Sequence, residues 1–112
     1  MIARVWKGRA AAANAEVYGE FLRRTAFPDY GGVQGNKGWI LLRRDAPPEV
    51  EFAFVSFWES MDAVRRYAGP DAERPKYYPE DEAFLLERPE KADHYEVVGS
   101  DLRFGQGAPE RG

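Results

Sequence analysis

Six side chains have the types and positions to build one chemical site: Arg4, Trp6, Asn36, Trp58, Tyr67 and His94. His94 is the single histidine, and an unperturbed pKa near 6.5 suits a general base at neutral pH. Such a base could deprotonate an acidic phenol or anthrone, and the resulting carbanion can react with oxygen directly. Trp58 and Tyr67 could form aromatic walls for a planar substrate, while Arg4 or Asn36 could stabilise its oxyanion.

The same residues also have a purely structural interpretation. Arg4 and Glu96 could form a cross-strand ion pair, and His94 could satisfy the end of a strand. Trp58 could belong to the core or to a dimer interface. Asn36 lies between glycines, where asparagine is most often a turn residue. Both interpretations place the same residues on one surface, so the elements that position them decide between the two.

The composition excludes several classes of function. One histidine and no cysteine exclude multi-histidine and thiolate metal sites, so we expect neither a metal nor a cofactor. The acidic run 80–82 lacks the ligand spacing of a calcium loop. A net charge of −3 with scattered arginines argues against nucleic acid, and no apolar run reaches the length of a membrane span. The missing cysteines favour a reducing compartment, and we expect a cytoplasmic protein.

The stretch from Glu51 to Gly69 organises the fold. Residues 52–58 are aromatic, β-branched or small on both alternating faces, which is typical of a strand covered on two sides. Ser60 can cap the following helix, whose apolar stripe is Met61, Val64 and Ala68 and which ends at Gly69. The stretch therefore predicts a strand followed by an amphipathic helix lying on its sheet.

Further elements are predicted on both sides of this unit. The pattern indicates strands at 1–7, 39–44 and 93–99, a helix at 11–26 and a short extra helix at 79–87. Gly8 is expected to end the first strand, and the glycine- and proline-rich residues 27–38 are expected to form a loop. The stripe of the first helix is Val17, Tyr18, Phe21 and Leu22. Residues 1–99 make a single domain, and residues 100–112 form a polar tail expected to be flexible or to wrap a partner.

The order of elements is β-α-β-β-α-β, the α+β ferredoxin-like split-βαβ plan, with helices on one face of an antiparallel sheet. This plan gathers six residues on one sheet face: Arg4, Trp6, Ser56, Trp58, His94 and Glu96. The uncovered face of a monomer would expose apolar residues, expected to be Trp6, Phe52, Phe54 and Trp58. We therefore expect a homodimer joined through the sheet face, in which each subunit keeps a cavity between its sheet and its second helix.

Several segments resemble the antibiotic biosynthesis monooxygenase family of dimeric α+β barrel proteins. They are MIARVW at the start, the turn at 35–38, FVSFWESMDAVRRYAG, YYPEDEAFLLE and HYEVV, which together span about 95 of the 112 residues. The resemblance implies a dimeric α+β barrel. It also implies a cofactor-independent monooxygenase-like function on an aromatic or polyketide-like small molecule, although other members of the wider family degrade haem or have no known reaction.

Two positions depart from the family pattern. Many members have a glutamate two residues before the strand tryptophan and a histidine nine residues after it, whereas this chain has Ser56 and Tyr67. Haem degradation in the family relies on a helical histidine, and no predicted helix contains one, so haem binding is the least favoured expectation. The alternative to a monooxygenase is a ligand-binding or accessory homodimer without catalytic activity.

Overall fold

The computed structural model describes residues 1–103, apart from the side chain of Phe27. The elements are β1 (Ile2–Ala11), the short 3-10 helix η1 (Ala12–Asn14), α1 (Ala15–Tyr30), β2 (Asn36–Ala46), β3 (Glu49–Trp58), α2 (Met61–Ala68), α3 (Pro79–Phe84) and β4 (Asp93–Glu96). This order confirms the predicted α+β ferredoxin-like plan with its short extra helix. The predicted tail has no helix or strand over 100–103, and its remainder lies outside the described residues.

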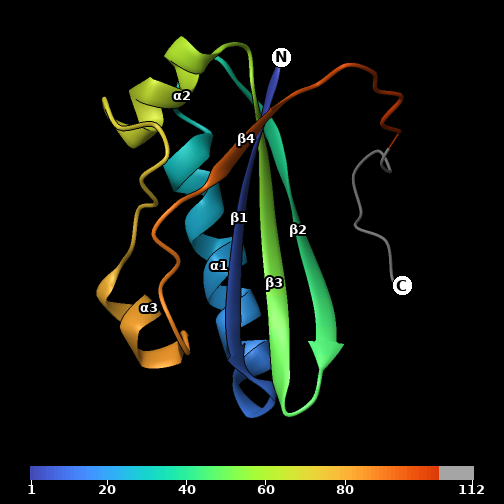
Figure 1. The fold of residues 1–112 in the computed structure, drawn as a ribbon, viewed down its shortest axis with the longest axis vertical. Helices are drawn as coiled ribbons and strands as arrows, with labels where there is room; N and C mark the ends of the chain where they lie inside the picture. The colour runs from blue at the N-terminus through green and yellow to red at the C-terminus, as the bar shows by residue number, and fades with distance from the viewer. Residues whose placement is uncertain (104–112) are drawn as a thin grey trace.

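The four strands form one antiparallel sheet in the order β2-β3-β1-β4. Helix α1 passes behind the sheet in Figure 1, with α2 above it and α3 beside it, so the viewer looks onto the face that no helix covers. The register sets Arg4 opposite Ser56 on β3 and opposite His94 on β4. The expected gathering of these residues on one sheet face is therefore confirmed.

Two predicted boundaries of the first strand and helix were wrong. Strand β1 continues through Gly8 to Ala11, because residues 8–11 keep their full pairing with residues 49–52 of β3. Gly8 is needed where the strand continues: a Cβ there would lie 2.4 Å from the Trp6 ring. Helix α1 consequently begins at Ala15 and presents Val17 to solvent, 58% exposed, instead of to the core.

The end of α1 also differs from the prediction. The helix includes Pro28 and ends at Tyr30, where a loop was expected. Proline fixes a φ angle that a helix also uses, and its missing N–H weakens only the last turn. Tyr30 packs its ring at 5.4 Å from Phe54 and 5.9 Å from Trp58, centroid to centroid. This burial holds the last turn in place.

The two sheet faces are exchanged relative to the prediction. Phe52, Phe54 and Trp58 are buried under the helices, so they are not on the uncovered face. The alternation of β3 was read correctly, but both faces of the strand are apolar and the pattern did not show which one the helices select. The helices cover the face with the larger rings, because those bury the most apolar area.

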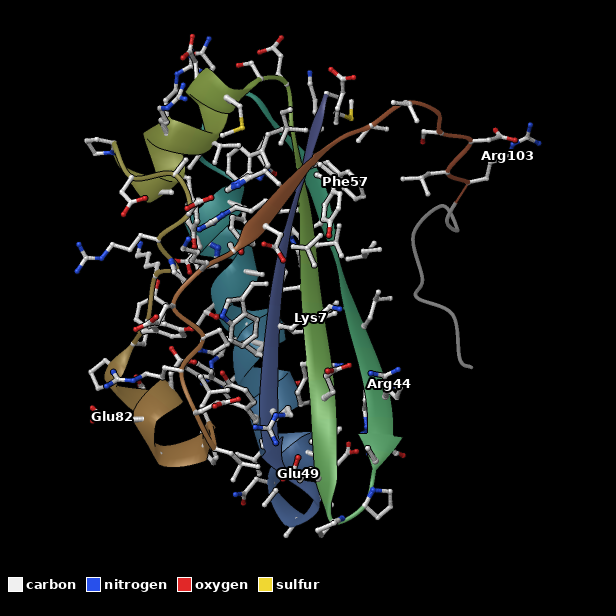
Figure 2. The ribbon with its side chains drawn as sticks, viewed as in Figure 1. Lys7, Arg44, Glu49, Phe57, Glu82 and Arg103 are labelled. Atoms are coloured by element: carbon white, nitrogen blue, oxygen red, sulfur yellow. The ribbon has the colours of Figure 1, made fainter. Side chains whose placement is uncertain are left out.

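The uncovered face carries an open-face patch of smaller apolar residues: Ala3, Val5, Ile40, Leu42, Ala53, Val55, Phe57 and Tyr95. Leu42 and Tyr95 are 49% and 59% exposed. Figure 2 shows Phe57 on this face, with the charged residues Lys7, Arg44 and Glu49 further along the strands. The sheet therefore has one aromatic face sealed by helices and one apolar face without cover.

The α2 start signal was predicted correctly. The Ser60 hydroxyl accepts a hydrogen bond from the Ala63 N–H at 3.2 Å, which satisfies one of the free donors of the first turn. Ala63 and Val64 are buried against Trp58 and form a second, smaller core cluster. Within residues 1–103, no helix is long and apolar enough to cross a membrane.

Candidate functional site

A small cavity lies between the helix-covered face of the sheet, the C-terminal half of α1 and the segment 75–81. Its volume is about 60 Å³, roughly the space of two water molecules. Seven rings line it: Trp6, Phe21, Tyr30, Phe54, Tyr67, Tyr77 and Tyr78. The charged lining residues are Arg4, Asp29, Lys76 and Asp81.

The cavity was expected between the sheet and α2, and this location was only partly correct. Tyr67 is the α2 residue that reaches the cavity. Ala63 and Val64 pack directly on Trp58 and leave no space below that part of the helix. The remaining walls come from α1 and from the segment 75–81, which lies on the helix-covered side of the sheet.

Arg4 is a buried cation at the cavity wall. Arg4 is 5% exposed, and one of its guanidinium N–H groups donates to the backbone oxygen of Arg74 at 2.9 Å. The guanidinium carbon lies 5.4 Å from the centre of the Tyr67 ring. Its Nε is buried and has no hydrogen-bond partner among the described residues. Burial lowers the pKa of Arg4 below its usual range, since desolvation disfavours the charged form.

The predicted ion pair between Arg4 and Glu96 is not formed. Glu96 is paired in register with Ile2, and across residues 1–103 no carboxylate lies within 4.0 Å of the Arg4 guanidinium. Glu96 is exposed at the end of β4. Arg4 thus has a backbone acceptor and an aromatic ring, but no counter-charge.

Trp58 lies beneath the cavity wall and does not line it. It is fully buried, and its indole N–H donates to the Ser56 hydroxyl at 2.9 Å. Tyr67 stacks on Trp58 with 5.6 Å between ring centroids, and Tyr30 lies 4.9 Å from Tyr67. Burial raises the pKa of Tyr30 and of Tyr67, so both phenols stay protonated at neutral pH. Tyr67 is therefore a wall residue, as predicted, and Trp58 supports it from the core.

Lys76 and Tyr78 close the cavity opposite the sheet. The Lys76 ammonium lies 5.7 Å from the centres of both the Tyr67 and the Tyr78 rings, and 3.9 Å from a carboxylate oxygen of Asp29. The Tyr78 hydroxyl donates to the same Asp29 oxygen. Burial and this hydrogen bond raise the pKa of Tyr78 to about 12. These contacts fasten the segment 75–78 to the end of α1.

Trp6 and Tyr77 fasten the same segment to the sheet. The Trp6 indole N–H donates to the Tyr77 hydroxyl oxygen at 3.0 Å, and that hydroxyl donates to the Pro89 carbonyl at 2.6 Å. Trp6 lines the cavity, in agreement with its predicted position in a site. Its indole N–H is occupied as long as Tyr77 stays in this position.

Asp81 is a buried carboxylate with both oxygens occupied. It is 4% exposed and accepts the Tyr18 hydroxyl at 2.7 Å and the backbone N–H of Tyr78 at 2.6 Å. Burial first, and the bond to Asp81 second, raise the pKa of Tyr18 far above its ordinary value. This pair joins α1 to α3 and has a structural role at the cavity wall.

His94, on β4, lies opposite Arg4 of β1 but is not part of the cavity lining. Its Nε2 is buried and has no hydrogen-bond partner among the described residues. Burial, and then the charge of Arg4, lower the pKa of His94 below 6.5, so the ring is neutral at neutral pH. A neutral imidazole could accept a proton, but the predicted role as general base needs a position on the cavity wall, and the structure does not provide it.

Asn36 has a structural role where β2 begins. Its amide nitrogen donates to the Phe57 oxygen at 3.2 Å, and its amide oxygen accepts from the Gly38 N–H at 3.1 Å. The strand register shifts at this point, between Asn36 and Gly38. The amide is used to hold this bulge and does not line the cavity, so Asn36 is not among the groups that this cavity brings together.

A second hollow of about 250 Å³ lies on the uncovered face, near Lys7, Arg9 and Glu51. It is larger than the first, but most of its charged residues are already in surface ion pairs. Arg9 bridges Glu49 at 2.6 Å and Glu87 at 2.8 Å. A groove of mutually paired surface ions has no feature that selects a ligand, so the aromatic cavity is the candidate site.

Sequence reasoning missed Tyr30, Asp29 and Lys76. Asp29 and Tyr30 fall in a stretch rich in glycine and proline that was assigned to a loop, and Lys76 follows a loop with no periodic pattern. Tyr77 and Tyr78 were not missed: with the acids after Pro79 the sequence predicts either a lid over the cavity or a segment that caps the core, and both rings line the cavity. Within residues 1–103, histidine and carboxylate side chains form no cluster of three that could hold a metal ion.

Comparisons with known proteins place the fold but no activity. The chain matches no known sequence family and no curated protein sequence. Among solved structures, it is similar to a Pseudomonas aeruginosa protein with a TM-score of 0.61 and 18% identity, covering 88% of this chain and 94% of that one. A putative antibiotic biosynthesis monooxygenase from Bacillus cereus gives a TM-score of 0.59 and 14% identity, covering 91% and 97%.

A protein of unknown function from Nitrosomonas europaea is similar at a TM-score of 0.59 and 17% identity, covering 93% of this chain and 95% of that one. The chain shares the fold of these proteins. At such low identities the similarity concerns the backbone arrangement alone, because one fold hosts many functions. Function must therefore be argued from the cavity.

Proposed function

We propose that the protein is a monooxygenase-like homodimer that binds an aromatic small molecule in the cavity below Tyr77 and Tyr78 and oxidises it with molecular oxygen. The observation that supports this is a cavity walled by seven aromatic rings with one buried guanidinium among them. Rings select a planar apolar molecule, and a guanidinium stabilises negative charge that develops on it. The fold shared with a putative antibiotic biosynthesis monooxygenase supports the same class of reaction.

The proposed reaction needs no group beyond the substrate and oxygen. An anthrone-like carbon that carries two hydrogens loses a proton to solvent water, and the electron-rich carbanion is oxidised by O₂. One oxygen atom becomes the new carbonyl, the other leaves as water with the two hydrogens, and the carbon is oxidised as O₂ is reduced. Arg4 stabilises the negative charge of the intermediate, and Tyr67 and Trp6 hold its plane.

The size of the cavity sets a condition on this function. Ligand sites for drug-sized molecules have volumes of about 300–1,000 Å³, and this one has about 60 Å³. A polycyclic substrate therefore enters only if the segment 75–78 moves outward. The contacts of Tyr77 with Trp6 and of Tyr78 with Asp29 would open in that motion, as lids do when they admit substrate.

A ligand-binding protein without catalytic activity is the second candidate. Two observations favour it: the cavity is small, and the one imidazole of the chain is off its wall. Such a protein would bind a small aromatic molecule and release it unchanged. Only the monooxygenase-like function forms an oxidised product, so formation of that product distinguishes the two functions.

Aerobic incubation with 1,8-dihydroxyanthracen-9-one tests the proposal. The protein, dialysed against a chelator, should consume one O₂ per quinone formed, at a rate well above that of buffer alone. Oxygen uptake and chromatography of the quinone measure this. Binding of the anthrone without faster oxidation would select the ligand-binding function instead.

A cavity-filling variant and a matched surface variant test whether the activity belongs to this cavity. Ala26 is buried and lines the cavity, so Ala26→Leu should remove both binding and oxidation. Ala12→Leu makes the same change at an exposed site and should behave as the parent. Equal oxidation by both variants would show that the activity does not reside in this cavity.

The proposed active form is a cytoplasmic homodimer joined through the open-face patch. This surface is continuous over all four strands and would expose a broad apolar area on a monomer. Large apolar patches on soluble monomers usually mark an interface. The cysteine-free sequence supports the reducing compartment.

A further inference from the structure

Arg4 lacks the counter-charge that a buried arginine normally has. Buried charges are ordinarily paired, because removal from water costs several kcal/mol per ion. Arg4 is 5% exposed, and its polar contacts are one backbone oxygen and the face of Tyr67. Its Nε–H has no acceptor among residues 1–103. The cavity wall therefore holds a buried guanidinium that has no ion-pair partner and a buried Nε–H that has no acceptor among the described residues.

The other charged groups of the cavity do not compensate Arg4. Both oxygens of Asp81 are occupied by Tyr18 and by the Tyr78 backbone. Asp29 accepts from Tyr78 and lies 3.9 Å from the Lys76 ammonium. Asp81 is thus hydrogen-bonded by neutral donors and Asp29 lies beside Lys76, so neither carboxylate forms an ion pair with Arg4.

The other groups near Arg4 provide no counter-charge. Directly across on β4, the Nε2 of His94 is a second buried polar atom without a partner. Lys76 adds another cation at the same cavity, 5.7 Å from the Tyr67 ring. The phenols of Tyr30 and Tyr67 remain protonated, so they can donate hydrogen bonds to an anion but cannot provide one.

We infer that Arg4 anchors a negatively charged group, so that the cavity takes an aromatic anion, a carboxylate or a phenolate, in preference to a neutral ring. The negative group supplies the counter-charge and the acceptor that Arg4 lacks, and the rings of Tyr67 and Trp6 hold the aromatic part. The inference rests on the proposed function and deepens it: an anthrone that enters as its own conjugate anion has already lost the carbon proton and needs no general base on the wall, which agrees with the position of His94 outside the lining.

Paired probes of equal shape test the anion preference. Benzoate and benzamide differ mainly in charge, and because their size is equal both need the same outward movement of the segment 75–78. Titration calorimetry should show benzoate binding at least about tenfold more tightly than benzamide, because a charge-assisted hydrogen bond is worth about 1.5–3 kcal/mol. Equal affinities, or a preference for benzamide, would overturn the inference.

Variants of Arg4 locate the preference. Arg4→Met should abolish it, Arg4→Lys should keep part of it, and Arg65→Met, an exposed change on α2, should leave it intact. The unfolding midpoint of Arg4→Met should be unchanged or higher, because the variant removes an unpaired buried charge. A preference for benzoate that survives in Arg4→Met would contradict the assignment.

A spectroscopic probe keeps the test independent of folding in the variants. 4-Nitrophenol absorbs differently as phenol and as phenolate. Bound to the unaltered protein below the pH at which it ionises in water, it should show the phenolate spectrum, and a phenol spectrum would refute an anion site. Oxygen uptake is measured separately. A failed oxidation would contradict the monooxygenase proposal alone, and a phenol spectrum would contradict the anion site alone.

Discussion

The hydrogen bond from Tyr18 to Asp81 joins two helices at the wall of the cavity. Tyr18→Phe removes that donor and leaves one oxygen of a buried carboxylate without a partner. We expect a loss of about 1–3 kcal/mol in the free energy of unfolding. Urea titration measures it, with Val17→Ala as the control, because Val17 is 58% exposed on the same helix. Equal effects of the two changes would mean that the buried bond contributes nothing specific.

His94 gives the stability of the protein a defined pH dependence. Burial, then the charge of Arg4, lower its pKa in the folded state below the 6.5 of the unfolded chain. Between these two values the unfolded state binds the extra proton, so the free energy of unfolding rises with pH there and falls on acidification. The contribution is fully present above about pH 7, where neither state is protonated.

The His94→Gln variant isolates this term, because the chain has no second histidine. From about pH 7.5 to about pH 5.5, the urea midpoint of the parent should fall more than that of His94→Gln. Parallel falls in the two proteins would show that other groups cause the acid sensitivity.

At the residue scale, the sequence predicted what strand alternation controls. The meeting of Arg4 with His94 and Ser56 follows from the period of two along each strand and from the order of the strands. The meeting of Lys76 with Asp29 and Tyr78 does not, because it depends on the path of an irregular segment. Side chains brought together by loops have no period in the sequence from which to predict them.

At the scale of elements, the junction between β2 and α2 depends on Gly35. Its φ is +94°, and a Cβ there would lie 2.6 Å from the Ala63 side chain. Gly35→Ala should cost about 2–5 kcal/mol, because backbone strain and overpacking add. Gly32→Ala introduces the same methyl where nothing lies within 4 Å and should be near neutral in the same unfolding measurement. A tolerated Gly35→Ala would indicate that α2 can shift away from the turn.

Element types were predictable, but some of their ends were not. Ser60 marked the start of α2 correctly, because capping is a local interaction. The end of α1 was wrong, since the packing of Tyr30 on Phe54 and Trp58 outweighs the local preference of glycine and proline for a loop. Tertiary contacts of this kind act between residues far apart in the chain and leave no local signal.

The same limit applied to the two sheet faces. Strand β3 is apolar on both sides, so periodicity alone could not show which side the helices cover. The face with Phe52, Phe54 and Trp58 is the one they bury. The expectation of an apolar uncovered face was still correct, although different residues form it.

At the scale of the whole molecule, the open-face patch predicts self-association. Large apolar patches on soluble monomers usually mark an interface, and the open-face patch extends over all four strands. Phe57 lies within the patch on the central strand β3, turned away from α1 (Figure 2). In a dimer joined through this face, Phe57→Asp would bury an unpaired carboxylate in an apolar interface, which is strongly unfavourable.

We therefore expect the parent to sediment as a dimer and Phe57→Asp to sediment as a folded monomer at the same micromolar concentration. Val17→Asp is the matched control, because Val17 is an exposed apolar residue on α1, in the opposite layer, and its replacement should leave the dimer intact. A monomeric parent would contradict the proposed interface, and dissociation by Val17→Asp instead of Phe57→Asp would place the contact on the helical layer.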